Sequence, residues 1–120
     1  MSNIEKSFDE IKKYIDTELN NDKTLFKTSN DEPTPLDCCS EILSKIPNKL
    51  WSKKNLKILD PCAGYGNFEI ILYQLLKDSY STKDILEKII SFNETNDKRI
   101  DLINQIFLGD KYNLNITNYD

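Results

Sequence analysis

Histidine is absent from the 120 residues, so no imidazole is available as a general base, a metal ligand or a member of a Ser/His triad. Cysteine is scarce: the three residues Cys38, Cys39 and Cys62 form no CxxC pair, and an odd number suits no disulfide framework. We expect Cys38 and Cys39 to be small buried residues on a helix. Cys62 has no neighbour that would activate its thiol, so it is interpreted as a packing residue. No metal site is expected.

Long apolar runs and an excess of positive charge are also missing. No hydrophobic run approaches the ~18 residues of a membrane-spanning helix, and the charged N-terminus lacks the apolar stretch of a signal peptide. The sequence therefore predicts an intracellular, cytoplasmic protein without a membrane partner. The net charge is −4, and Arg99 is the only arginine, which argues against binding nucleic acid by bulk charge alone.

The length fits one compact domain at most, and the hydrophobic content of 38% predicts a modest core. Apolar residues at helical spacing predict an amphipathic helix over residues 3–19. A polar stretch with two prolines follows it, and residues 20–35 are interpreted as a loop or linker. We divide the chain into an N-terminal helix and linker, residues 1–31, and a domain over residues 32–120.

The remaining elements alternate between helices and short apolar strands. Thr34 is predicted to cap a helix that has Pro35 at its first position and ends at Pro47. Further elements are predicted as a buried strand over 56–60, a helix over 67–80, a helix over 82–92 capped by Thr82, a helix over 96–105, a second buried strand over 106–108 and the start of a third strand within 114–120. The alternation indicates an α/β fold with a parallel sheet.

Glycine is rare, and two of the three glycines, Gly64 and Gly66, lie in the turn between the first strand and the next helix. Such a turn allows a ligand to approach the backbone closely at the carboxyl end of a sheet. A dinucleotide fingerprint would need a third glycine where Glu69 stands, and the P-loop pattern is absent. Asp60 at the end of the strand favours a ligand with a positive charge or hydroxyl donors. An ordinary strand-to-helix turn is the alternative.

The stretch ILDPCAGYGNF resembles motif I of S-adenosylmethionine-dependent methyltransferases, and more narrowly that of the adenine-N6 DNA methyltransferases, D-P-x-x-G-x-G-x-F. The resemblance implies that this loop binds the cofactor. The residues that it assigns to the cofactor here are Asp60, Pro61, Ala63, Gly64, Gly66 and Phe68.

Three further segments are similar to the same family. EPTPLDCCSEIL resembles motif X, which implies that Thr34 and Pro35 help to hold the methionine end of the cofactor. IFLGD resembles the second strand, whose acid binds the ribose hydroxyls, and this assigns Asp110. NLNITNYD resembles the third strand, whose acid contacts the adenine amino group, and this assigns Asp120. A carboxylate suits both roles because it accepts hydrogen bonds. Loop acids without a ligand are the alternative for Asp110 and Asp120.

The family resemblance implies a partial Rossmann-like fold, S-adenosylmethionine as cofactor and DNA as the substrate of the complete enzyme. The catalytic N-P-P-Y type of motif, which orients the target amine, does not occur in this sequence. We therefore assign no catalytic residue and expect no turnover from this chain alone. A separate chain carrying the catalytic half, a protein or RNA N-methyltransferase fragment, and a non-catalytic binding module remain as alternatives.

Overall fold

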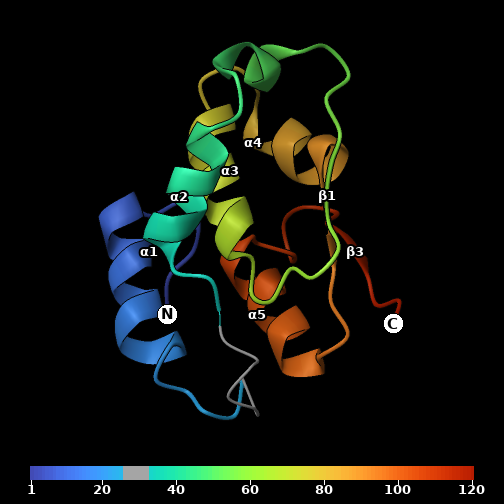
Figure 1. The fold of residues 1–120 in the computed structure, drawn as a ribbon. Coiled ribbons are helices and arrows are strands. Elements are labelled where there is room, and N and C mark those ends of the chain that lie inside the picture. Colours follow the sequence, from blue (N-terminus) through green and yellow to red (C-terminus); the bar gives the residue numbers. More distant parts are fainter. Residues whose placement is uncertain (26–32) are drawn as a thin grey trace.

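A computed structural model describes residues 1–25 and 33–120 of the chain. Part of the predicted linker and the predicted boundary between residues 31 and 32 lie outside the described residues. Within the described part, helices and strands alternate along the chain (Figure 1). The α-helices are α1 (Phe8–Tyr14), α2 (Leu36–Ser44), α3 (Asn67–Leu76), α4 (Thr82–Asp84) and α5 (Asp97–Ile106). Three shorter helical segments accompany them: the π-helices η1 (Ile15–Leu19) and η3 (Ile85–Ile89), and the 3₁₀-helix η2 (Asn48–Ser52).

Three parallel strands form the sheet in the order β1-β2-β3. They are β1 (Ile58–Asp60), β2 (Ile90–Asn93) and β3 (Asn115–Thr117), with Asp60 paired to Phe92 and Phe92 paired to Ile116. Helices connect the strands, as parallel pairing requires. The predicted α/β class with a parallel sheet is thereby confirmed, and the strand expected within residues 114–120 is present.

The strands differ in burial according to their place in the sheet. Ile90 and Phe92 of the central strand are fully buried, whereas Ser91 and Asn93, which point to the other face of the sheet, are half-buried. β1 is an edge strand, and the side chain of Leu59 is 62% exposed. The prediction of a buried strand over residues 56–60 is therefore correct in position but wrong about burial.

Three helix starts differ from the sequence predictions. The first helix begins at Phe8 and not near residue 3, because the Ser7 side chain accepts from the Glu10 N–H. Pro35 occupies the N-cap position of α2, and no side chain caps that helix, so Thr34 is not the cap. Ser81, rather than Thr82, caps α4 by accepting from the Asp84 N–H.

The region between residues 82 and 110 contains the largest errors of prediction. The helical region after Thr82 ends at Ile89, and residues 90–93 form β2 instead of continuing as a helix. Residues 106–108 are not a strand, because α5 extends through Ile106 and the Phe107 N–H still donates to the Ile103 carbonyl. Both errors concern short apolar runs, for which residue pattern alone does not separate a buried strand from a helix segment.

The N-terminal segment packs onto the same core as the sheet. The Ile4 N–H donates to the carbonyl of Ile106 at the end of α5, at 3.0 Å. Ile4 and Ile11 belong to the buried apolar cluster that also contains the core residues of α3 and β2. The helices α2 and α3 pack side by side, and α1 lies beyond α2 (Figure 1).

Candidate functional site

The glycine loop, residues 61–66, turns the chain from β1 into α3. Gly64 and Gly66 have φ angles of +62° and +95°, in the left-handed region that favours glycine. A Cβ atom on Gly66 would lie 2.5 Å from the ring of Phe107, so a side chain has no room there. Both backbone conformation and packing therefore require a glycine at Gly66.

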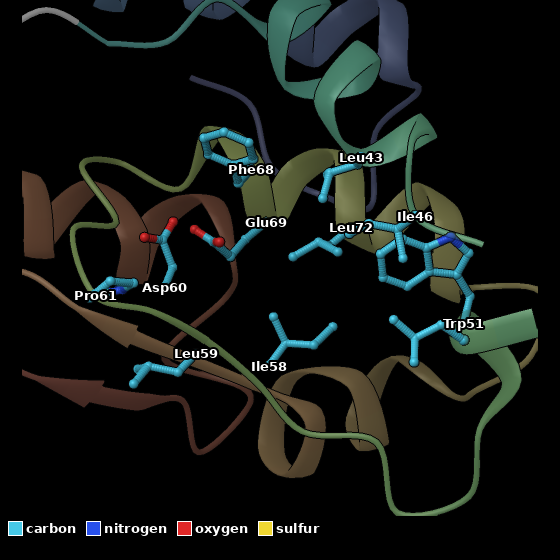
Figure 2. A pocket seen from close by; sticks show the side chains of 11 residues that line it. Leu43, Ile46, Trp51, Ile58, Leu59, Asp60, Pro61, Phe68, Glu69 and Leu72 are labelled. Atoms are coloured by element: carbon cyan, nitrogen blue, oxygen red, sulfur yellow. The ribbon is translucent and has the colours of Figure 1, made fainter. Parts of the chain in front are cut away.

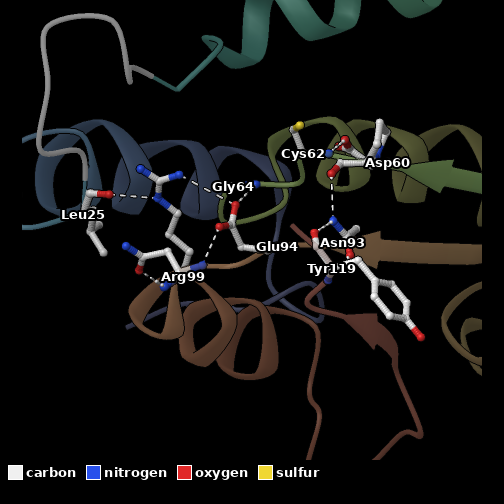
Figure 3. A network of polar contacts seen from close by, with 10 residues as sticks. Leu25, Asp60, Cys62, Gly64, Asn93, Glu94, Arg99 and Tyr119 are labelled. Atoms are coloured by element: carbon white, nitrogen blue, oxygen red, sulfur yellow. Dashed lines mark hydrogen bonds and ion pairs between the residues drawn. The ribbon is translucent and has the colours of Figure 1, made fainter.

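The loop is attached to the carboxyl end of the neighbouring strand β2. The Ala63 N–H donates to the Asn93 carbonyl at 2.9 Å, and the Gly64 N–H donates to Glu94 Oε1 at 3.0 Å (Figure 3). Glu94 is only 6% exposed, and its other oxygen accepts from the Asn96 N–H at 2.8 Å. Arg99 Nη1 lies 3.7 Å from Glu94 Oε1. Glu94 is thus a buried, paired carboxylate that holds the loop in place.

Asn93 joins the ends of all three strands. Its Nδ2 donates to the Pro61 carbonyl after β1, at 3.1 Å, and to the Tyr119 carbonyl after β3, at 2.8 Å (Figure 3). Its Oδ1 accepts from the Thr117 hydroxyl and the Tyr119 N–H, at 2.7 and 2.9 Å. One side chain therefore fixes the spacing of the sheet's carboxyl edge.

A polar hollow of about 540 Å³ lies at this carboxyl edge, in the size range of small-molecule sites. It is the place where open α/β sheets bind ligands. Its lining residues come from the ends of the three strands and from α5: Pro61, Cys62, Asn93, Glu94, Thr95, Arg99, Tyr119 and Asp120.

An apolar cavity of about 250 Å³ lies on the other side of the glycine loop, beside β1 (Figure 2). Pro61 borders both spaces. The walls are apolar side chains of α2, η2, β1 and α3, and two carboxyl groups, of Asp60 and Glu69, face one another at one end (Figure 2). A ligand with an apolar body and a hydrogen-bond donor matches this lining.

Apart from the hydrogen bond that a protonated Glu69 can donate to Asp60, the buried oxygens of these two carboxyl groups have no partners among the described residues. Asp60 Oδ1 accepts from the Cys62 N–H at 3.1 Å and so caps the turn, whereas Asp60 Oδ2 has no other partner. Glu69 is fully buried, and neither of its oxygens has a further hydrogen-bond partner. Burial, and next the nearby charge of Asp60, raise the pKa of Glu69 well above its ordinary value. This end of the cavity would stabilise a positively charged or donor group.

Four of the ten predicted cofactor residues line these two spaces. Asp60, Pro61 and Phe68 line the apolar cavity, and Asp120 lines the polar hollow, while Ala63, Gly64 and Gly66 form the loop between them. The Thr34 carbonyl accepts from the Asn67 side chain, which places Thr34 and Pro35 next to the start of α3.

Asp110 does not join the other residues. It lies exposed in the turn between α5 and β3, and the strand whose end it was predicted to mark does not exist. The chain enters β3 at the amino end of the sheet, where the Asn113 N–H donates to the Glu87 carboxylate before β2. The prediction for Asp110 rested on that missing strand, and Glu94 holds the expected place at the end of the second strand.

Sequence reasoning missed Glu94 and Asn93. The signal was present in the alternation of Ile90 and Phe92 followed by the polar run NETN, which is typical of a strand that ends in a turn. It was assigned to a helix because the preceding residues have helical spacing.

The cysteines differ partly from expectation. Cys39 is buried, and burial, with Glu69 as the next cause, raises the pKa of its thiol to about 12, so the thiol stays protonated. Cys38 and Cys62 are exposed, which makes the expected burial of Cys38 and the packing role of Cys62 wrong. Cys62 lines the polar hollow instead.

Across residues 1–25 and 33–120, no three His, Cys, Asp or Glu side chains lie close enough to hold a metal ion. The helices in that part of the chain are too short or too polar to cross a membrane. Neither the models of known protein families nor the curated proteins match this sequence. The function of the chain is therefore inferred from the geometry of the glycine loop and the two spaces beside it.

Proposed function

We propose that this chain is the cofactor-binding part of an S-adenosylmethionine-dependent methyltransferase that resembles the adenine-N6 DNA class, with a partial Rossmann-like fold. One observation carries the proposal: the glycine loop stands between a polar hollow edged by carboxylates and a cavity that ends in the facing carboxyl groups of Asp60 and Glu69. A ligand with hydroxyls at one end and an ammonium at the other has complementary groups for both spaces.

The residues present fit the cofactor by hydrogen-bond chemistry. The ribose hydroxyls, the adenine amino group and the methionine ammonium are all donors, and the site offers carboxylate acceptors. Asp120 would accept from the adenine amino group, and Glu94, which retains acceptor capacity beside its internal bonds, would accept from the ribose. Asp60, with Thr34 and Pro35 nearby, would hold the methionine end. When bound, the cofactor supplies a methyl group on a sulfonium.

The methyl acceptor in this proposal is the N6 amino group of adenine in DNA. The sequence has no N-P-P-Y motif to orient that amine, so we infer that the chain alone does not turn over. In this proposal the motif comes from outside the given sequence, and a separate chain that carries the catalytic half is one source of it. A methyltransferase that acts on protein or RNA would use the same cofactor loop. A methylation assay, with the chain complemented by its catalytic half, would distinguish DNA, RNA and protein as the methyl acceptor.

A non-catalytic module is the second candidate, and the state of Glu94 favours it. Both oxygens of this carboxylate are engaged by the backbone of Gly64 and Asn96, and Arg99 lies beside them. If Glu94 serves mainly to hold the glycine loop, its burial and pairing are explained without a cofactor. The polar hollow would then have no ligand.

Calorimetric titration with S-adenosylmethionine tests the proposal. We expect saturable binding to the wild type and an affinity about tenfold lower or worse for Asp120→Asn, since one charge-assisted hydrogen bond is lost. Asp110→Asn makes the same chemical change at an exposed turn away from the hollow and should leave the affinity unchanged. Absence of binding by the wild type, or equal binding after Asp60→Ala, would support the non-catalytic module.

A further inference from the structure

The outer edge of β1 is unpaired among the described residues. β1 pairs with β2 on one side only, because it is the first strand in the order β1-β2-β3. An edge strand presents backbone N–H and C=O groups that can pair with another chain. The exposed Leu59 adds an apolar side chain to this edge.

The apolar cavity opens along this same edge. All three residues of β1 line it, together with Leu43, Ile46, Leu50, Trp51, Phe68 and Leu72 (Figure 2). Side chains alternate along a strand, so Ile58 and Asp60 point to the same face of the sheet. A strand laid beside β1 would therefore place one side chain near Ile58 and, two residues later, another near Asp60.

The carboxyl groups at the end of the cavity specify the charge of that second side chain. Apart from the hydrogen bond between the two side chains, neither oxygen of the fully buried Glu69 nor Asp60 Oδ2 has a partner within the described part of the chain. A buried acceptor without a donor costs free energy, and a Lys or Arg would satisfy these groups by charge-assisted hydrogen bonds. The apolar stem of such a side chain suits the apolar walls.

We propose that the edge of β1 and its cavity are a docking site for an extended segment of a partner polypeptide. The segment adds to the sheet as a further strand parallel to β1. It carries the pattern apolar–x–Lys or apolar–x–Arg, with the apolar side chain beside Ile58 and the basic group at Asp60 and Glu69. The basic group and the methionine end of the proposed cofactor would both use Asp60, so the peptide and the cofactor should compete for the protein.

Synthetic peptides test the docking site, with Trp51 as the reporter, because it is the only tryptophan and it lines the cavity. The probe is the capped peptide Thr-Val-Thr-Val-Thr-Lys-Thr. We expect a saturable change in Trp51 fluorescence and shifts of the Leu59 and Asp60 amide resonances. Replacing Lys by Glu, reversing the sequence, or N-methylating alternate peptide bonds should each weaken binding by about tenfold or more.

Matched variants of the protein complete the experiment. Glu69→Gln should reduce the preference for the Lys peptide over the Glu peptide, whereas Glu41→Gln, on the exposed side of α2, should keep it. Thermal unfolding of both variants establishes that they are folded. Equal binding of the Lys and Glu peptides, or binding unaffected by N-methylation, would overturn the proposal. Self-association of the chain that protects the β1 amides would overturn it in favour of a second copy.

Discussion

The backbone N–H of Gly64 donates to the carboxylate of Glu94 at 3.0 Å, across 30 residues of sequence. This bond connects the glycine loop after β1 to the end of β2, so the loop is fixed by the neighbouring strand and not by its own sequence alone. Because Glu94 is buried, the bond is shielded from water, and breaking it would lower the free energy of unfolding.

Glu94→Gln should destabilise the fold by about 1–3 kcal/mol, because the charge that faces Arg99 and the two backbone donors is removed. Urea denaturation measures the free energy of unfolding, and hydrogen exchange should show a less protected Gly64 amide. The exposed Glu41→Gln variant controls for the chemical change. A Glu94→Gln protein as stable as the wild type would show that the carboxylate does not hold the loop.

Gly66→Ala should be more costly than Gly64→Ala. Alanine at either position is forced to a positive φ, which costs about 1–2 kcal/mol. At Gly66 the new Cβ also displaces the buried Phe107 ring, whereas at Gly64 the nearest atom, Asn67 Oδ1, lies at 3.7 Å. We expect a total loss of about 3 kcal/mol or more for Gly66→Ala. Denaturation of the two variants in parallel decides this, and equal losses would refute the contact with Phe107.

Glu69→Gln should stabilise the protein at neutral pH. The folded-state pKa of Glu69 is raised above its ordinary value of 4.5, so the folded protein binds this proton more tightly than the unfolded chain. The cost of ionising Glu69 is absent well below pH 4.5 and grows as the pH rises toward the raised pKa. An amide at this position carries no charge and can donate to Asp60.

Thermal melts of wild type and Glu69→Gln from acidic to neutral pH measure this effect. The difference in stability should reach about 1–3 kcal/mol at pH 7 and shrink at acidic pH. Glu41→Gln serves as the control because its side chain is exposed. A difference that is constant across the pH range would show that Glu69 does not titrate abnormally.

Asn93→Asp should loosen the carboxyl edge of the sheet. The substitution keeps the shape but removes both donors, to the Pro61 and Tyr119 carbonyls, and places a charge beside those oxygens. We expect a loss of about 1–3 kcal/mol and faster hydrogen exchange in the glycine loop. Asn118→Asp, at an exposed position nearby, is the matched control. Unchanged hydrogen exchange of the amides in residues 61–66 would show that Asn93 does not hold the glycine loop in place.

The local sequence predicted the strongest features of the fold correctly. The DP–GxG turn, the strand that ends at Asp60, the helix after Gly66 and the strand before Asp120 are all present. Each has a signal within a few residues: paired glycines, a proline after an apolar run, or helical spacing of apolar side chains. The helix predicted over residues 96–105 is also present as α5, and the structure shows that Asn96 caps it.

The sequence by itself determined where the chain must turn, since positive φ at Gly64 and Gly66 requires glycine wherever the rest of the molecule lies. Only the tertiary structure decided which acids meet that turn. The run at residues 90–93 became a strand because β1 and β3 pair with it on either side, and that pairing delivered Glu94 to the loop and left Asp110 in a distant turn. Burial of Glu69 was decided in the same way, because no local pattern reveals which side chains close over a residue. Hydrogen bonds and burial between segments far apart in sequence depend on the whole fold, and they set the chemistry of this site.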